Sequence, residues 1–264
     1  MKTLWKKTPV WIKAILLNIL WLYPVIFTVR IIIETNLRSK PTWGWGLILI
    51  IGLLVGYWYL AKKTFFKADH RIQLISNLKP WGKRSWLCVL GIVSTLSGIS
   101  LLSAVVLDVQ SSAQLDYIVS FKAYSPIIAI PLLMGLALSA GVVEEILYRG
   151  IIQNMLTKYA SWVRYLYIAI LFTAAHFLPL VLILPYILMS VIFSLVADVS
   201  KSTLQVILGH FLFDFFVFCL LYFETLDVTN IQPHHLTISI VLLCSGIIML
   251  FFGIKKEDKT SVKI

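Results

Sequence analysis

The sequence predicts an all-α membrane protein, a polytopic bundle of about eight transmembrane helices with both termini in the cytoplasm. Of its 264 residues, 59% are hydrophobic and only 13% are charged, and the mean hydropathy is +0.91. A soluble domain carries about 25% charged residues. The apolar residues form runs close to the ~20 residues that a helix needs to cross the hydrocarbon core. Because these runs are continuous rather than alternating, a β-barrel is disfavoured.

Eight apolar segments are expected to cross the membrane. The run 165–199 is too long for one crossing, and Pro179 and Pro185 interrupt helical hydrogen bonding in its middle, so we divide it into two spans. The fourth segment begins at Pro126, and its helix is expected to continue to about Tyr159, past the bilayer. The expected spans cover residues 10–33, 43–61, 85–107, 126–159, 162–178, 182–199, 203–223 and 236–254. Small residues predict close helix packing at Gly91, Ser94, Gly98, Ser139, Ala140 and Gly141.

Basic residues indicate the orientation of the chain. With eight spans, most Lys and Arg residues fall on one side of the membrane, in segments 1–9, 62–84, 158–164, 201 and 255–264. The other side receives only Arg38, Lys40 and Lys122. The positive-inside rule therefore places both termini in the cytoplasm, whereas seven spans would move the basic tail outside. The net charge of +11 does not indicate nucleic-acid binding, because its residues lie between spans rather than in a basic soluble domain.

The whole chain, residues 1–264, is expected to form a single membrane domain. Its candidate functional residues all lie in a core at 126–220. The first three spans, within 10–107, are expected to be peripheral, and 255–264 is expected to be a basic cytoplasmic tail. The three cysteines lie in apolar segments without CxxC spacing, which is typical of small core residues.

Few ionisable residues lie inside the expected spans. Ionised side chains at membrane depth are costly, so each needs a partner or a function. They are Glu144, Glu145 and Arg149 near the end of the fourth span, His176 in the fifth, and His210 and Asp214 in the seventh. The core is otherwise nearly free of ionisable groups. The carboxylates of Glu144 and Asp214 and the imidazoles of His176 and His210 are together suited to activating water.

Helical spacing suggests partners within this set. Glu145 and Arg149 are separated by four residues, which predicts a structural salt bridge. Glu144 is turned about 100° away from Glu145, so its partner is expected on another span, and the two histidines are the candidates. His210 and Asp214 are also four residues apart, and the carboxylate could orient the imidazole or share a metal with it.

Three motifs carry a resemblance to a known family. They are Glu144-Glu145-Ile-Leu-Tyr-Arg149, Phe172-Thr-Ala-Ala-His176 and His210-Phe-Leu-Phe-Asp214. In this order, each in a transmembrane span, they resemble the CPBP family, the CAAX-protease and bacteriocin-processing membrane proteins also called Abi. The resemblance covers about residues 126–220.

The resemblance implies a glutamate-dependent intramembrane endopeptidase. Glu144 and His176 would activate the attacking water, and His210 with the residue at 214 would stabilise the oxyanion. Position 214 is Asp where the prenyl-protein proteases have Asn, and an ionised Asp cannot donate a hydrogen bond. Asp214 would more naturally hold His210 cationic or ligate a metal.

Some members of the family are described as metalloproteases. Glu144, His176, His210 and Asp214 are therefore the candidate ligands for Zn²⁺, although the sequence contains no HExxH motif. We favour metal-free activation of water, because no dedicated metal motif is present.

The main alternative is a non-catalytic bacteriocin self-immunity or regulatory membrane protein. A transporter is disfavoured, since no inverted repeat is evident. The expected partners are the lipid bilayer and a peptide or protein substrate, without nucleic acid, and the expected location is the bacterial cytoplasmic membrane.

Overall fold

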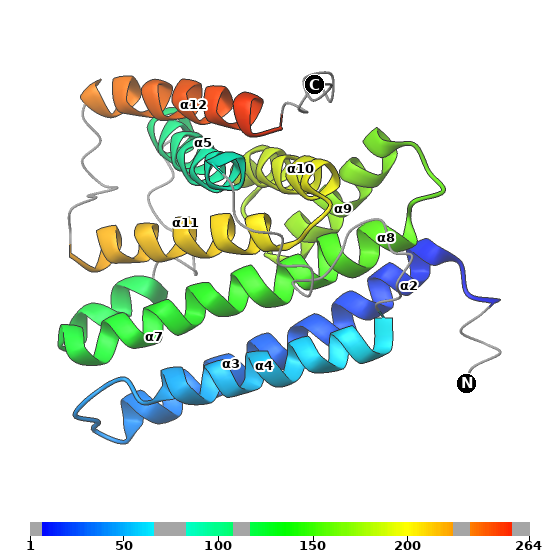
Figure 1. Cartoon of the computed structure of the whole chain (residues 1–264). Coiled ribbons are helices and arrows are strands. Elements are labelled where there is room, and N and C mark those ends of the chain that lie inside the picture. Colours follow the sequence, from blue (N-terminus) through cyan, green and yellow to red (C-terminus); the bar gives the residue numbers. More distant parts are fainter. Residues whose placement is uncertain (1–6, 66–82, 108–116, 224–232, 255–264) are drawn as a thin grey trace, which may run out of the picture.

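Helices make up the architecture of the chain (Figure 1). The computed structural model describes residues 7–65, 83–107, 117–223 and 233–254. Most of the predicted basic loop at 62–84 and the tail at 255–264 lie outside these residues. The elements are α2 (Val10–Leu17), η1 (Asn18–Leu22), α3 (Tyr23–Arg38), α4 (Gly46–Phe65), α5 (Lys83–Leu107), η2 (Ser120–Ala123), α7 (Pro126–Ser139), η3 (Ala140–Glu144), η4 (Ile146–Ile152), α8 (Gln153–Met155), α9 (Ser161–Ala175), η5 (Leu180–Leu182), α10 (Ile183–Ser200), α11 (Leu204–Tyr222) and α12 (Pro233–Ile254).

Seven helices of the described segments are long and apolar enough to cross a membrane, which confirms the predicted class of multi-pass helical protein. They cover Val10–Arg38, Gly46–Phe65, Lys83–Val106, Pro126–Met155, Leu180–Ser200, Leu204–Tyr222 and His234–Ile254. The predicted fifth span is a helix of only 15 residues, α9, and at 1.5 Å per residue it is about 22 Å long. The helix of the fourth span ends at Met155 rather than near Tyr159.

Prolines explain several of these boundaries. Pro126 opens α7 at a position where its missing N–H has no helical partner. Pro179 separates α9 from η5 and α10, as predicted. Pro185 does not break a helix, because it lies in the first turn of α10, where the preceding carbonyls are outside the helix.

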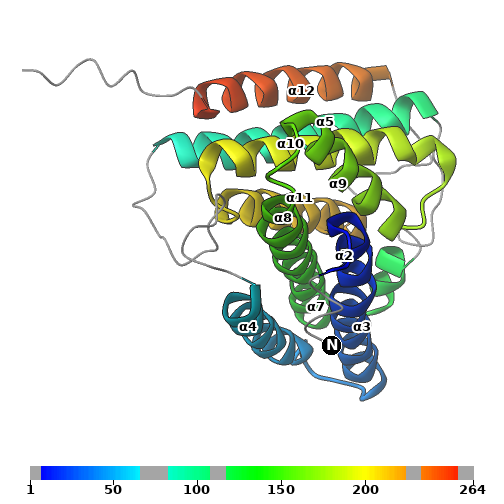
Figure 2. The same ribbon diagram turned by 90° about the vertical axis from the view of Figure 1, so that its right-hand side faces the viewer.

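The helices are arranged in layers (Figures 1 and 2). α5 and α12 lie on one face of the bundle, α10 and α11 lie beneath them, and α7 lies between α11 and the pair α3 and α4. In Figure 1, α2 begins and α12 ends toward the same end of the bundle. The placement of both termini in the cytoplasm stays a prediction.

Small residues allow neighbouring helices to approach closely. A Cβ added at Gly98 of α5 would lie 2.7 Å from the backbone nitrogen of Leu243 in α12. Ser94 adds a hydrogen bond between the same helices, donating from its hydroxyl to the carbonyl of Leu242 at 2.8 Å. The helix that runs from Pro126 to Met155 carries the Glu144–Arg149 motif and is called the motif helix. A Cβ at Gly141 of this helix would lie 2.8 Å from the carbonyl oxygen of Ile207 in α11. The close packing predicted at these positions is confirmed.

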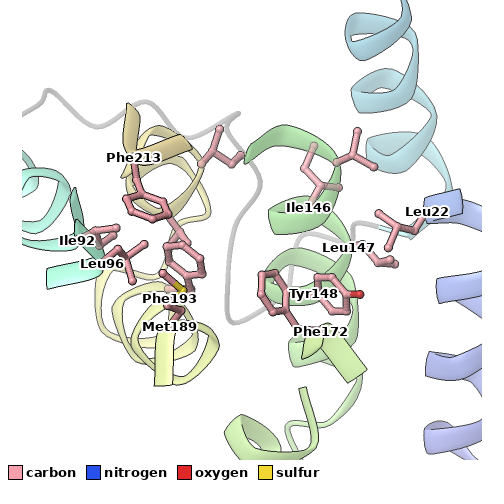
Figure 3. Packing of buried hydrophobic residues seen from close by; sticks show 14 of the residues in the cluster. Leu22, Ile92, Leu96, Ile146, Leu147, Tyr148, Phe172, Met189, Phe193 and Phe213 are labelled. Carbon is pink, nitrogen blue, oxygen red and sulfur yellow. The ribbon is translucent and has the colours of Figure 1, made fainter. Parts of the chain in front are cut away.

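Aromatic and aliphatic side chains fill the interior around the motif helix (Figure 3). Tyr148 packs edge-on against Phe172 of α9, with ring centroids 5.4 Å apart. Phe193 of α10 and Phe213 of α11 lie together beside Ile92 of α5. The apolar core therefore joins the three helices that carry the sequence motifs.

We expect Gly98→Ala to destabilise the protein, because the new methyl group would overlap the backbone of α12. The loss should be about 1–3 kcal/mol, the usual cost of overpacking. Thermal unfolding of the detergent-purified protein would measure it.

The matched control is Gly52→Ala in α4, where an added Cβ meets nothing within 4 Å. This variant should be as stable as the wild type or more stable, because Ala favours helix. Equal stability of the two variants would contradict the close contact of α5 and α12.

Candidate functional site

The two glutamates lie on a stretch of π-helix rather than regular α-helix. η3 and η4 flank Glu145 and together extend from Ala140 to Ile152. π-Helical turns are rare and occur frequently at functional sites. Sequence reasoning missed this feature, because an α-helical period was assumed for the whole fourth span.

Glu145 and Arg149 form the predicted ion pair at the centre of the bundle. Arg149 Nη1 donates to Glu145 Oε1 at 3.0 Å, and both side chains are fully buried. The second amino group of Arg149, Nη2, donates to the hydroxyl of Ser190 at 2.7 Å and to its carbonyl at 3.0 Å. The guanidinium also lies 5.0 Å from the ring centroids of Phe172 and Phe193. Charge, hydrogen bonds and cation–π contacts thus compensate for burial of the cation.

Glu145 has a second partner that the sequence did not predict. His210 Nδ1 lies 2.8 Å from Glu145 Oε1, and His210 Nε2 lies 3.4 Å from Asp214 Oδ2. The imidazole stacks on Phe193, with centroids 4.8 Å apart. A neutral imidazole has one N–H, so carboxylates facing both nitrogens favour the imidazolium form. Glu145 therefore also orients His210, a task that the sequence suggested only for Asp214.

Glu144 faces the other histidine. His176 Nε2 lies 3.8 Å from Glu144 Oε2, and the exposed fractions of the two side chains are 16% and 7%. His176 is the C-terminal cap of α9 rather than a residue within the helix. Its Nδ1 lies 2.7 Å from the carbonyl oxygen of Phe172. A carbonyl only accepts, so Nδ1 carries the proton, and in the neutral ring Nε2 presents a lone pair toward Glu144.

The Glu144–His176 separation is too long for a direct hydrogen bond. Glu144 Oε2 is buried and has no hydrogen-bond partner among the described residues. Buried polar atoms are normally satisfied by protein or by water. The arrangement therefore presents an acceptor and an imidazole nitrogen on either side of a position suited to one water molecule.

The four candidate zinc ligands do not form one ligand shell. No group of three or more His, Cys, Asp or Glu side chains in the described part of the chain is placed to hold a single ion. Glu144 pairs with His176, while His210 pairs with Glu145 and Asp214. Zinc binding by these side chains stays an untested prediction.

Helices from the first two spans contact the motif helix directly. Tyr57 of α4 donates from its hydroxyl to the carbonyl of Val143 at 3.1 Å. Tyr148 donates to Asn18 Oδ1 of η1 at 2.9 Å, and both residues are buried. The expectation that these spans are peripheral is therefore corrected. A polar Asn within the first apolar run was the available signal.

A second buried polar cluster connects α9 with α10. Arg164 donates to Asp198 Oδ2 at 2.8 Å, and the hydroxyl of Tyr165 donates to the same oxygen at 2.6 Å. The charge count placed Arg164 among the basic residues between spans, but the side chain is buried. Asp198 was missed within the apolar sixth span. The cluster ties the start of α9 to the end of α10 and so fixes the helix that carries His176.

Fold and site together define a multi-pass helical membrane protein with a polar centre made of His–carboxylate pairs. Residues 126–216 match the family of type II CAAX prenyl endopeptidases described as Rce1-like. The matched segment contains all three motifs, and the resemblance to the CAAX-protease family is confirmed. No curated protein and no solved structure matches the chain.

Replacing Arg149 by Met should strongly destabilise the fold, because the buried Glu145 carboxylate would lose its counter-charge. Breaking a buried ion pair costs about 3–5 kcal/mol. Denaturant or thermal unfolding in detergent would measure the loss.

Arg38→Met is the matched control, since Arg38 also pairs with a glutamate four residues away, at 3.5 Å, but its side chain is 82% exposed. Its effect should stay below about 1 kcal/mol. Similar losses in the two variants would show that the Glu145–Arg149 pair does not carry the stability assigned to it.

Proposed function

We propose that the protein is an intramembrane endopeptidase that hydrolyses a peptide bond in a membrane-associated peptide or protein. The match of residues 126–216 to a protease family supports this proposal. The observation that carries it is the Glu144–His176 pair, in which a carboxylate oxygen with no hydrogen-bond partner in the described part of the chain faces an imidazole across 3.8 Å.

In the proposed reaction, a water molecule lies between Glu144 Oε2 and His176 Nε2. Glu144 removes one proton as the water oxygen attacks the carbonyl carbon of the substrate. The C–O bond forms, and the carbonyl π-electrons move to oxygen as the tetrahedral oxyanion. Transfer of the proton from Glu144 to the amide nitrogen then allows the C–N bond to break, releasing an amine and a carboxylic acid. The second proton of the water passes from this acid to the amine, which leaves a carboxylate and an ammonium group.

His210 is suited to stabilise the oxyanion. Glu145 holds its Nδ1 at 2.8 Å, so the ring is fixed with Nε2 directed toward Asp214 at 3.4 Å. That longer contact leaves the Nε2–H available to a substrate oxygen. In this scheme Asp214 supports the imidazolium charge and does not itself donate to the oxyanion, because a carboxylate has no proton to give.

Glu144→Gln should slow peptide cleavage by about 10²–10⁴-fold, the usual contribution of a general base. The amide preserves size and hydrogen bonding but cannot accept the proton from water. The assay would use the purified protein in liposomes with a panel of fluorogenic membrane-anchored peptides, including prenylated ones.

Arg38→Gln provides the control, because the Arg38 side chain is 82% exposed and pairs with Glu34 on the surface of α3. This variant should cleave at the wild-type rate. Wild-type cleavage by Glu144→Gln would overturn the proposed mechanism. A cellular phenotype that survives Glu144→Gln would instead favour the alternative of a non-catalytic immunity or regulatory protein.

The proposed reaction needs no metal ion, so cleavage should persist after dialysis against a strong zinc chelator. Elemental analysis of the purified protein should find well under one zinc per chain. Loss of cleavage on chelation, with recovery on adding Zn²⁺, would contradict metal-free water activation.

A further inference from the structure

We propose that Tyr23 of the first helix, together with Phe177, forms a subsite for an apolar side chain of the substrate next to the bond that is cleaved. This inference rests on the proposed peptidase function and deepens it. It assigns specificity to a helix outside the segment that matches the protease family, which begins at residue 126.

Tyr23 lies beside the reacting pair although it is far from it in the sequence. Its hydroxyl donates to the carbonyl of Ala175 at 3.4 Å, and Ala175 immediately precedes His176. The Glu144 carboxylate lies close enough to act electrostatically on the same hydroxyl. Tyr23 thus connects α3 with the end of α9 at the position of the proposed nucleophilic water.

An apolar groove leads to Tyr23 along the outer face of α3. It is lined by Ile19, Tyr23, Pro24, Ile26, Phe27 and Arg30. Ile19 and Phe27 are exposed, at 52% and 64%. Arg30 pairs with Glu34 at 2.9 Å, which partly offsets its charge at the far end of the groove. The lining nearest to the site is therefore suited to an apolar group.

Phe177 also lies beside Tyr23. The two ring centroids are 6.3 Å apart. Phe177 has a φ angle of 49°, a left-handed conformation that is unfavourable for a bulky residue. It is also 83% exposed, so burial of its ring within the protein does not compensate for this conformation.

These observations have one explanation in common. An aromatic ring held beside Tyr23, directly after His176, gives an apolar substrate side chain a second wall to pack against. Tyr23 lines the groove, contacts Phe177 and bonds to the residue before His176, so it joins the apolar lining to the Glu144–His176 pair. The size of the side chain accommodated there depends on both rings.

The test is a set of peptides that differ only in the residue adjacent to the cleaved bond, which is Ala, Leu or Trp. The measured quantity is the ratio of kcat/KM values for two peptides, which does not depend on the fraction of folded enzyme. Tyr23→Ala removes one wall and should shift the Trp-to-Leu ratio by about tenfold or more in favour of Trp.

Phe177→Gly is a second variant that should fold well, because Gly readily adopts a positive φ angle. It should lower the preference for Leu over Ala by a similar factor. Tyr167→Ala is the matched control, since Tyr167 also ties α9 to the first span, donating to the carbonyl of Trp11 at 2.7 Å. Its ratios should equal those of the wild type.

Unchanged ratios in both Tyr23→Ala and Phe177→Gly, alongside Glu144-dependent cleavage, would overturn the subsite and leave the proposed function intact. Absence of Glu144-dependent cleavage for every peptide would overturn the proposed function and the subsite with it. Equal shifts in Tyr167→Ala would show that loosening α9 alone explains the effect, which also overturns the subsite.

Discussion

The arrangement of the polar centre depends on one buried carboxylate. Glu145 accepts hydrogen bonds from Arg149 of its own helix and from His210 of α11. Arg149 in turn donates to Ser190 of α10. The Glu145–Arg149 pair therefore links three helices, and Glu145 sets the direction of an imidazole ring. An uncompensated charge in this position would be costly, so each of these charged groups depends on its partners for stability.

Aromatic rings complete this linkage. Phe172 and Phe193 flank the Arg149 guanidinium, and each also contacts a histidine, His176 for the former and His210 for the latter. Phe172 of the second motif therefore contacts both Arg149 of the first motif and His176 of its own motif. Each carboxylate–imidazole pair therefore has one of these two rings beside its histidine.

Much of this could be predicted from the sequence, because long apolar runs, prolines and rare ionisable residues are strong signals. The helical class, the division at Pro179 and the Glu145–Arg149 contact follow from elementary spacing rules. The π-helical turns could not be predicted, since the local hydrogen-bond pattern depends on tertiary packing. Contacts of Asn18 and Tyr57 with the motif helix were also missed, because one sequence does not show which spans are neighbours in space.

The shortness of α9 has a consequence for where the reactant water comes from. A helix of about 22 Å that starts near one surface ends inside a hydrocarbon layer of about 30 Å. Its last residues and the non-helical segment after it then lie where backbone amides have no lipid partner, and such backbone is stable only against protein or water. Protein groups satisfy part of this backbone, since the amides of His176 and Phe177 donate to the carbonyls of Thr173 and Ala174. A backbone group there without such a partner needs water, and a hydrolysis could draw its nucleophile from the same water.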